Sequence, residues 1–466
     1  MPDAGSFILL FIVATMVALV AGRLRLPYTV ALVIAGLGLG GMHALEPPHL
    51  TEELLFAVFL PGLLFEAAFH VDASQFRRNL LAIVSLAVPG VVAAIALTTV
   101  LLVPIAGRLP FVADFDWRTA LVFGALISAT DPIAVVALFK SLGVPRRLGL
   151  LVEGESLLND GTAIVFFTLV LGLVAGGRVT PGGLALEFVR VVGTGAMVGA
   201  VIGFGVAQVI RRVDDAMIEI TLTTIAAYGS FVAAERVGAS GVIATVVAGM
   251  LSGNYATRIG MSPSTRIAVE SFWEYVAFAL NSLVFLLIGF EVKLTALRDS
   301  WLAIVVAYLV VVTGRAIVVT VVSAALRRTR ERLPARWSAV LAWGGLRGGL
   351  SMVLALSLPA SMPHRSFLVT VTFGVVVLSI LIQGITMSSL LRTLGIVSRG
   401  GSLAEHERRR GALQAARAAL DELERVVRTR YTSGAAVEIL RDDYEVRIAE
   451  EGGRLRELHV DPRAFA

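Results

Sequence analysis

The sequence predicts an all-α polytopic membrane protein, and three observations lead to that prediction. Of the 466 residues, 56% are hydrophobic and only 16% are charged, whereas about 25% of the residues in an average soluble protein are charged. Apolar runs long enough to enter a bilayer recur along the first 395 residues. Because backbone groups inside lipid must be satisfied within each segment, these runs are expected to be helices.

Charged residues and clusters of Pro and Gly divide the apolar runs into about 13 candidate transmembrane helices. The expected ranges are 6–22, 28–42, 51–69, 80–106, 118–140, 147–175, 185–210, 216–236, 240–252, 267–291, 301–326, 336–358 and 366–392. Residues 396–466 are polar and rich in Arg and Glu, and Leu413, Ala416 and Leu420 begin an apolar stripe at helical spacing. We therefore expect a transmembrane domain over residues 1–395 and a cytoplasmic helical tail over 396–466.

The loops between these spans carry Lys and Arg unevenly. Every second loop, beginning with the one after the first span, holds at least two basic residues, and the largest cluster lies between Arg327 and Arg336. Because basic residues are enriched in cytoplasmic loops, the N-terminus is expected outside and the C-terminus in the cytoplasm. The same bias accounts for the net charge of +5, so membrane lipid is an expected partner and nucleic acid is not.

Two of the spans contain residues that break helices. The fifth span contains Thr130, Asp131 and Pro132, and the twelfth contains four glycines around Arg347. The two spans lie seven spans apart and cross the membrane in opposite directions, as an inverted repeat of spans 1–6 onto 8–13 requires. Paired broken helices mark the binding site in many transporters, although Pro and Gly can also simply kink a membrane helix. Because helix ends carry partial charges, we expect Asp131 to neutralise helix N-termini and Arg347 to neutralise C-termini.

The sixth span carries four polar side chains on adjoining helical turns, namely Glu155, Ser156, Asn159 and Asp160. At about 100° per residue they fall within roughly 140° of arc, so they face one side of the helix. All four offer oxygen, the ligand that a hard cation prefers, and Thr130 can add a hydroxyl or a carbonyl. A charged side chain at the bilayer centre costs at least about 2.5–3.5 kcal/mol, which makes these residues functional candidates.

A carboxyl in such a position can hold either of two ions. Burial favours the protonated form of a carboxyl, so a group such as Asp160 holds a proton or a cation but not both. This competition predicts exchange of protons for cations. The sequence has no cysteine, no nucleophile–base set and no spaced metal motif, so we expect neither an enzyme nor a cofactor.

Two further charges lie inside apolar spans. Glu66 lies in the third span and Arg315 in the eleventh. Because buried charges normally pair, we expect Glu66 to pair with Arg315 or Arg347. Glu66, Asp131, Glu155 and Asp160 contribute four negative charges to this cluster, and Arg315 and Arg347 contribute two positive ones. The cluster then carries two net negative charges before a cation binds.

Glycines at helical spacing occur in two other spans. The run from Gly36 to Gly41 superficially resembles a nucleotide-binding loop, but no strand precedes it. Close helix packing explains it better, and the same holds for Gly195, Gly199 and Gly203.

Three motifs together resemble the signature of NhaP/NHE-type sodium–proton antiporters of the monovalent cation:proton antiporter superfamily. They are Thr130-Asp131-Pro132, Gly154-Glu155-Ser156-Leu157-Leu158-Asn159-Asp160-Gly161 and Gly345-Leu346-Arg347-Gly348. The resemblance covers roughly residues 1–395. It implies an NhaA-like fold of two inverted six-helix repeats with two crossing discontinuous helices, in a homodimer of the plasma (inner) membrane.

The resemblance also implies roles for single residues and for whole segments. Asp160 would be the carrier of Na⁺ and H⁺, with Thr130, Glu155 and Ser156 as further Na⁺ ligands. Asn159 would order Glu155, and an Asn before the carrier implies electroneutral one-for-one exchange serving pH homeostasis. A core near 80–175 and 301–392 would move as an elevator against dimerisation helices near 6–69 and 185–291.

Oxygen ligands do not fix the size of the ion, so Li⁺ and K⁺ remain alternatives to Na⁺. A K⁺/H⁺ antiporter is the nearest alternative function. A cation channel is a further alternative, but it needs a continuous pore with rings of carbonyls or acids, which a single buried cluster on broken helices does not suggest.

Overall fold

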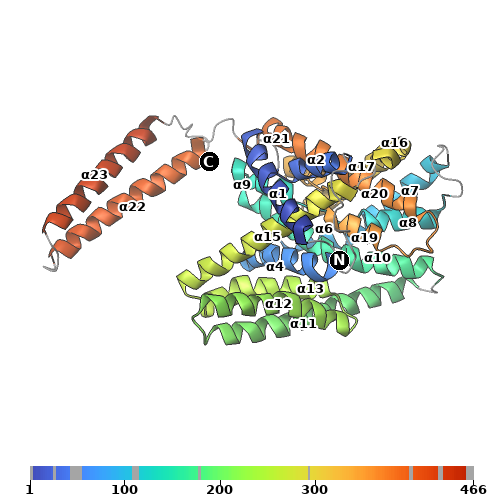
Figure 1. Ribbon diagram of the computed structural model, residues 1–466, viewed down its shortest axis with the longest axis horizontal. Helices are drawn as coiled ribbons and strands as arrows, with labels where there is room; N and C mark the ends of the chain where they lie inside the picture. The colour runs from blue at the N-terminus through green and yellow to red at the C-terminus, as the bar shows by residue number, and fades with distance from the viewer. Residues whose placement is uncertain are drawn as a thin grey trace. The chain divides into compact units, whose positions relative to one another are not determined.

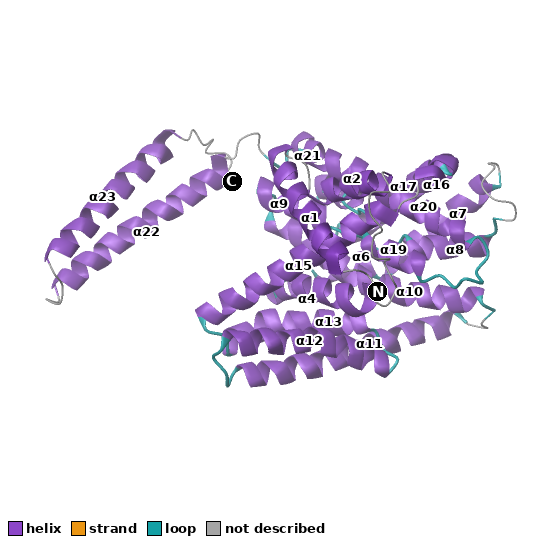
Figure 2. Ribbon diagram, in the orientation of Figure 1, coloured by secondary structure: helices purple, strands orange, loops and turns teal. Residues whose placement is uncertain are grey.

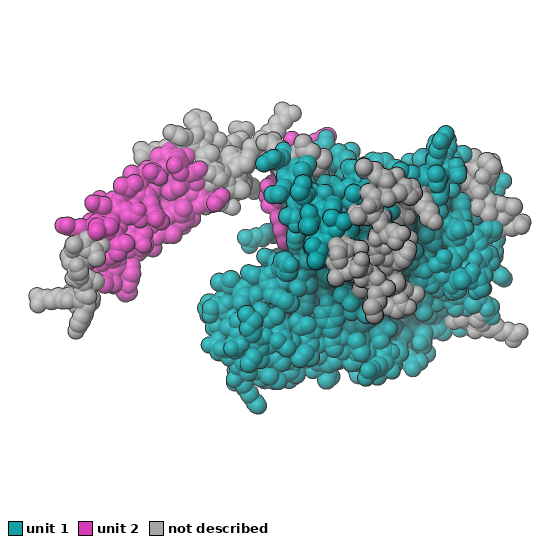
Figure 3. All heavy atoms as spheres, in the orientation of Figure 1, with its two compact units in different colours: residues 1–139, 145–391 teal, residues 140–144, 392–466 magenta. Residues whose placement is uncertain are grey.

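The computed structural model describes residues 4–24, 28–41, 55–107, 115–176, 180–291, 294–397, 402–428 and 434–457. These residues form helices and connecting turns, and no strand occurs among them (Figure 2). The chain divides into two compact units, one of residues 1–139 and 145–391 and one of residues 140–144 and 392–466 (Figure 3).

Helices follow one another along the first half of the chain, and one of the expected spans there is broken in the middle. They are α1 (Ala4–Leu24), α2 (Tyr28–Gly41), the π-helix η1 (Leu55–Phe59), α4 (Leu60–His70), α5 (Ala73–Arg78), α6 (Leu80–Ala87), α7 (Pro89–Ala106), α8 (Trp117–Leu126), α9 (Ile133–Leu142), α10 (Arg146–Val174) and α11 (Pro181–Ile210). The broken span is the one that contains α8 and α9.

The second half of the chain continues in the same way and contains the other broken span. Its helices are α12 (Ala216–Arg236), α13 (Gly241–Leu251), the π-helix η2 (Ser252–Ala256), α14 (Thr257–Ile259), α15 (Pro263–Glu291), α16 (Leu294–Asp299), α17 (Trp301–Leu326), α18 (Ala335–Trp343), α19 (Gly349–Leu356), α20 (Arg365–Leu378), the π-helix η3 (Ser379–Gln383) and α21 (Gly384–Thr393). The broken span contains α18 and α19.

Helix is present in every one of the 13 ranges that the sequence analysis expects. Seven of the described helices, counting contiguous segments together, are long and apolar enough to cross a membrane. Four further apolar helices of 10–17 residues lie at Ile8–Ala21, Tyr28–Gly40, Phe56–His70 and Ile133–Leu142. The protein is therefore a multi-pass helical membrane protein, while the exact number of crossings stays a prediction.

Polar side chains fix the starts of several helices. Asp72, Asp116, Thr180, Asp215 and Ser240 each accept a hydrogen bond from a backbone N–H in the first turn of the helix that follows, which satisfies donors that the helix itself leaves unpaired. At Asp72, between α4 and α5, hydrogen bonds from the Ser74 hydroxyl and the Gln75 backbone hold the pKa of the carboxyl below its ordinary value.

Within the larger unit, the most extensive helix packing falls into two sets. In one set α2, α4, α11, α12, α13 and α15 pack together, and in the other α6, α7, α8, α10, α17, α19 and α20 do (Figure 1). Weaker packing of α10 on α4, α11 and α13, and of α15 on α19, joins the two sets. Helices α8 and α19, one from each broken span, belong to the second set, together with α10.

Glycines allow the closest helix approaches in the first set. A Cβ atom on Gly36 of α2 would lie 2.2 Å from the Leu286 carbonyl oxygen of α15, and one on Gly199 of α11 would lie 2.1 Å from the Ala244 carbonyl oxygen of α13. No side chain fits at these distances, so the two backbones touch directly. The packing interpretation is confirmed for Gly36 and Gly40 of α2 and for the three glycines of α11, whereas a Cβ atom on Gly38 would meet no neighbour within 4 Å.

The smaller unit contains α22 (Ser402–Arg428) and α23 (Gly434–Glu457). The two helices pack against each other, with Ala416 and Val437 buried between them. An ion pair of 3.1 Å joins Arg409 to Glu451. The apolar stripe that begins at Leu413 therefore belongs to a helical hairpin.

Candidate ion-binding site

The two interrupted helices meet at their breaks. Helix α8 ends at Leu126 and α9 begins at Ile133, while α18 ends at Trp343 and α19 begins at Gly349. The backbone N–H of Asp131 in the first break donates a hydrogen bond of 2.8 Å to the Leu346 carbonyl in the second. The two breaks therefore bring helix ends of both kinds, positive and negative, to one place in the fold.

Asp131 interacts with the N-terminal ends of both half-helices. Its carboxylate accepts a hydrogen bond of 3.0 Å from the Ile133 N–H at the start of α9, and it also accepts one from the Gly349 N–H at the start of α19. A carboxylate stabilises a helix N-terminus because it compensates the partial positive charge there. One side chain thus serves both N-termini.

Two arginines interact with the C-terminal ends. Arg347 donates from Nη1 to the carbonyls of Ser128 and Ala129, just beyond α8, at 2.7 and 3.0 Å. Arg315 of α17 donates from Nη2 to the Leu341 carbonyl of α18 at 3.2 Å. Arg347 contacts a helix C-terminus, as the sequence predicts. The sequence does not predict that Arg315 contacts the C-terminal end of α18.

Arg315 forms a buried ion pair with Glu155 of α10. Nη1 and Nη2 of Arg315 lie 2.7 and 2.6 Å from the two carboxylate oxygens of Glu155. The exposed fractions of the two side chains are 8% and 3%. A bidentate pair of this kind is among the stronger charge-assisted contacts in proteins, and it occupies both oxygens of Glu155.

The expected pairing of Glu66 with Arg315 or Arg347 is wrong. Glu66 lies on α4, where its carboxylate is 3.2 Å from His70 Nδ1 and 24% exposed. Sequence reasoning treated it as buried because its neighbours are apolar. It missed His70, one helical turn further on, as the nearer partner.

The polar residues of α10 contact the first break. Ser156 Oγ donates to the Thr130 carbonyl at 2.5 Å, and the Asn159 amide donates to the Thr130 hydroxyl at 2.9 Å and to the Ser128 carbonyl at 3.2 Å. Thr130, Ser156 and Asn159 are buried, while Asp160 is partly exposed. Asp160 lies near enough to Asp131 and Glu155 for their negative charges to repel.

These contacts change the expected role of Asn159. Its side chain orders Thr130 and the end of α8, whereas Glu155 is oriented by Arg315. The Asn159 Oδ1 atom has no hydrogen-bond partner in the part of the chain that the structure describes, so this oxygen is available to a ligand.

Because Glu66 does not belong to the charged cluster, the net charge of the cluster also differs from the expected value. Asp131, Glu155 and Asp160 are balanced by Arg315 and Arg347 except for one net negative charge when all five are ionised. A single monovalent cation or a single proton cancels that charge.

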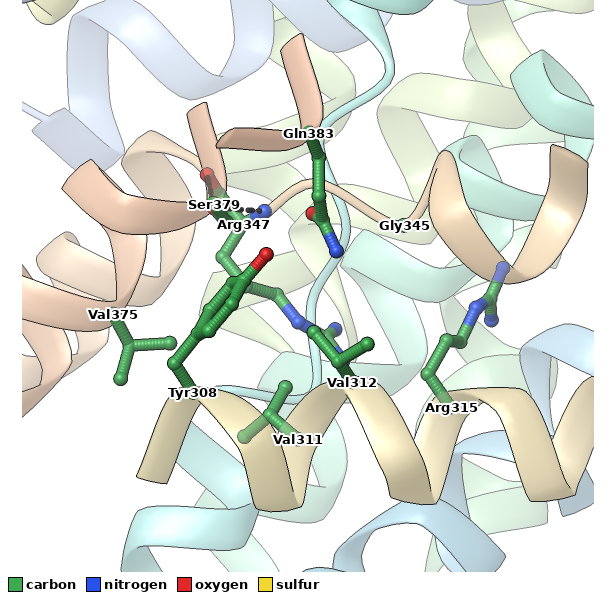
Figure 4. A pocket seen from close by; sticks show the side chains of 9 residues that line it. All are labelled: Tyr308, Val311, Val312, Arg315, Gly345, Arg347, Val375, Ser379 and Gln383. Carbon is green, nitrogen blue, oxygen red and sulfur yellow. Dashed lines mark hydrogen bonds between the residues drawn. The ribbon is translucent and has the colours of Figure 1, made fainter. Parts of the chain in front are cut away.

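Sequence reasoning also missed a contact of Arg347 to the π-helix η3. Ser379, the first residue of η3, accepts a hydrogen bond of 3.0 Å from the Arg347 backbone N–H (Figure 4). Ser379 and Gln383 are the polar first and last residues of η3, with only Ile and Leu between them, and that spacing was the available signal.

Gly348 is the tightest point of the crossing, and its substitution gives a testable prediction. A Cβ atom there would lie 2.1 Å from Asp131 Oδ2 and 2.2 Å from Asp131 Cβ. Gly348→Ala should displace Asp131 from the two helix N-termini and lower the free energy of unfolding by about 1–3 kcal/mol, the usual range for overpacking. Thermal or denaturant unfolding of the purified protein measures the loss.

Gly314→Ala on α17 is the matched control for Gly348→Ala. Its added Cβ would meet its nearest neighbour, Leu97 Cβ, at 3.8 Å, an ordinary contact, and Ala is the better helix former by about 1 kcal/mol. If the Gly348→Ala protein were as stable as the Gly314→Ala protein, that result would contradict the tight contact between Gly348 and Asp131.

The fold and the site together define a class of protein. A helical membrane protein with paired broken helices that meet at a charged centre belongs among secondary transporters. The family model described as "Sodium/hydrogen exchanger, transmembrane" matches residues 8–393. The chain therefore belongs to the sodium/hydrogen exchanger family, which is a family of transporters and not of enzymes.

Individual relatives agree with this assignment. The chain is 40% identical over 375 residues to the Na⁺/H⁺ antiporter ApNhaP of Aphanothece halophytica, covering 80% of this chain and 70% of that protein. It is also 40% identical over 356 residues to the Na⁺/H⁺ antiporter NhaP of Pseudomonas aeruginosa, covering 74% of this chain and 81% of the relative.

A solved structure supports the fold. The sodium proton antiporter MjNhaP1 of Methanocaldococcus jannaschii matches with a TM-score of 0.69 over 84% of this chain and 98% of that chain. The two sequences are 19% identical over the match, so this likeness bears on the fold alone.

Proposed function

We propose that the protein is a secondary antiporter that exchanges Na⁺ for H⁺, with Asp160 as the group that holds either ion. The observation that carries the proposal is the charge balance at the crossing. Glu155, Asp131 and the two arginines are engaged with one another or with helix ends, which leaves Asp160 as the partly exposed carboxyl with the uncompensated charge. The names of the relatives support the same function.

The Na⁺ ligands in this proposal come from Asp160 and from the oxygens around the first break. Ser156 and Thr130 offer hydroxyl and carbonyl oxygens, and Asn159 Oδ1 offers an amide oxygen that is unpaired within the described residues. Hard monovalent and divalent cations prefer such oxygen ligands. Glu155, whose two oxygens contact Arg315, is proposed as part of the scaffold and not as a direct ligand. No cofactor takes part, since the transported ions are the substrates.

We propose that exchange is electroneutral, one Na⁺ for one H⁺. Because one net negative charge remains among the five ionisable groups, the site is neutral with either ion bound. A site that crosses the membrane in the same charge state in both directions moves no net charge.

The transport cycle is proposed to be an elevator in which a core near 80–175 and 301–392 moves against helices near 6–69 and 185–291. The two packing sets of helices support this division. We further propose a homodimer in the plasma membrane, with the N-terminus outside, the C-terminal tail in the cytoplasm, and pH homeostasis as the physiological role.

Proton flux in liposomes of purified protein tests the function. An imposed Na⁺ gradient should drive protons in the opposite direction, as an internal pH-sensitive dye reports, and a clamped membrane potential should leave the rate unchanged. The Asp160→Asn protein in the same liposomes is the control. Cation current without coupled proton movement would identify a channel instead.

The same assay tests which ion is carried. Na⁺, Li⁺ and K⁺ gradients of equal size are compared, and Na⁺ is expected to give the fastest proton flux. Coupling to K⁺ with no response to Na⁺ would assign a K⁺/H⁺ antiporter and contradict the choice of ion, while leaving the antiport mechanism in place.

A further inference from the structure

A small cavity lies between α17, the break at 344–348 and η3, and none of the residues proposed to bind Na⁺ lines it. The side chains and backbone that line it are those of Tyr308, Val311, Val312, Arg315, Gly345, Arg347, Val375, Ser379 and Gln383 (Figure 4). Its space of about 10 Å³ for the centre of a water molecule is at the lower limit for holding one water.

Polar atoms without partners are concentrated on the walls of this cavity. Tyr308 Oη, Arg315 Nε, Arg347 Nε and Gln383 Oε1 are buried and have no hydrogen-bond partner among the residues that the structure describes. The exposed fractions of these four residues are 6%, 7%, 3% and 2%. Figure 4 shows the Arg315 guanidinium lying apart from the other three groups. Buried polar groups are almost always hydrogen-bonded, to protein or to ordered water, so the three remaining atoms around one cavity require an explanation.

We infer that this cavity is a binding site for water, which bridges α17, the second break and η3. Of these three atoms, Arg347 Nε is an N–H donor, Gln383 Oε1 is a carbonyl acceptor, and the tyrosine hydroxyl can both donate and accept. Water matches this set because one molecule can donate two hydrogen bonds and accept two. A chloride ion would satisfy the donors but would place a negative charge against Gln383 Oε1, and a dry cavity would leave all three atoms unpaired.

The water site has a consequence for the charged centre. Arg347 uses Nη1 to contact the carbonyls at the end of α8, and its Nε is left for the cavity. The bound water therefore supplies the remaining contact of a buried cation and connects it to the π-helix η3. π-helical turns are frequent at functional sites. This inference concerns the scaffold and holds or fails independently of the proposed exchange reaction.

Tyr308→Phe tests the inference through the sign of its effect. If the hydroxyl is hydrogen-bonded to water, its loss lowers the melting temperature. If the hydroxyl is buried without any partner, its removal relieves an unpaired polar group and raises the melting temperature. We expect a decrease, and a decrease also for Gln383→Leu. An increase for both variants would overturn the water site.

Two matched Val→Leu variants on α20 provide a second test. Val375 lines this polar cavity, while Val371, one helical turn earlier, lines an apolar cavity of the same size between α7, α8, α17 and α20. Leu at position 371 fills dry space, whereas Leu at position 375 displaces water from its polar partners. Val375→Leu should lower the melting temperature relative to Val371→Leu, and equal effects would contradict the inference.

Direct observation and anion exchange separate water from an ion. A structure at a resolution that shows ordered solvent should contain density within hydrogen-bond distance of Arg347 Nε and Gln383 Oε1. The melting temperature should be the same in sodium chloride and in sodium gluconate at equal Na⁺. A chloride-dependent increase that Tyr308→Phe abolishes would assign an anion and overturn the assignment of water.

Discussion

Asp160→Asn is expected to yield a folded protein that exchanges no Na⁺ for H⁺. Asparagine has nearly the same shape as aspartate but carries no charge and binds no proton in the physiological range, so it can neither compensate Na⁺ nor alternate between two ions. Removal of the carboxylate also removes its repulsion with Asp131 and Glu155, so the thermal stability should be unchanged or higher. Proton flux driven by a Na⁺ gradient in liposomes measures the loss.

Asp299→Asn is the matched control for this experiment. Asp299 is an exposed carboxylate at the end of α16, and the same chemical change there should leave exchange intact. Asp160→Asn liposomes that still exchange at the rate of the control would remove Asp160 from its proposed role. Loss of folding in Asp160→Asn alone would show instead that the carboxylate is structural.

Arg315→Met is expected to be the most destabilising of the single substitutions considered. It leaves the carboxylate of Glu155, 3% exposed, without its partner in a site shielded from water. Breaking a buried pair in this way typically costs about 3–5 kcal/mol. The double variant Glu155→Gln/Arg315→Met removes both charges and should recover most of the lost stability. Unfolding of the two variants in detergent measures the difference.

The pair of Arg266 with Glu270 gives the matched control. Its nitrogen–oxygen distance is also 2.7 Å, but its side chains are 54% and 31% exposed. Arg266→Met should therefore cost about 0–1 kcal/mol, as exposed pairs do. If Arg315→Met lowers the free energy of unfolding no more than Arg266→Met does, the conclusion that burial makes the Arg315–Glu155 pair important would be contradicted.

The double variant also decides the role of Glu155. If Glu155 belongs to the scaffold, the refolded double variant should retain measurable exchange, with an apparent KM for Na⁺ close to that of the wild type. A stable double variant with a strongly raised KM would show that Glu155 binds Na⁺ directly.

Much of the fold was predictable because lipid restricts the chain to a few solutions. Long apolar runs predict helices, and Thr130-Asp131-Pro132 and the glycines around Arg347 predict where two helices break. The electrostatics of broken helices then indicated that Asp131 would lie at N-termini and Arg347 at a C-terminus. The rules for helices and breaks are local and depend on residues within one or two turns of each other, whereas the positions of Asp131 and Arg347 also depend on the inverted repeat that brings the two breaks together.

The partners of buried charges were less predictable, because they depend on how distant helices pack. Glu66 and Arg315 both lie in apolar spans, and sequence alone gave no reason to prefer Glu155 over Glu66 as the partner of Arg315. The cavity between Tyr308, Arg347 and Gln383 was invisible for the same reason. Its residues come from three segments whose contact only the tertiary structure shows.

The pH dependence of Na⁺ affinity tests the central claim, that Na⁺ and H⁺ compete for Asp160, most directly. Exchange rates of the purified protein in liposomes are measured against Na⁺ concentration at a series of pH values. At pH values below the pKa of the Asp160 carboxyl, competition predicts that the apparent KM for Na⁺ rises about tenfold for each unit by which the pH falls, while the maximal rate stays constant. A maximal rate that falls with pH while KM stays constant would show that the two ions occupy separate sites.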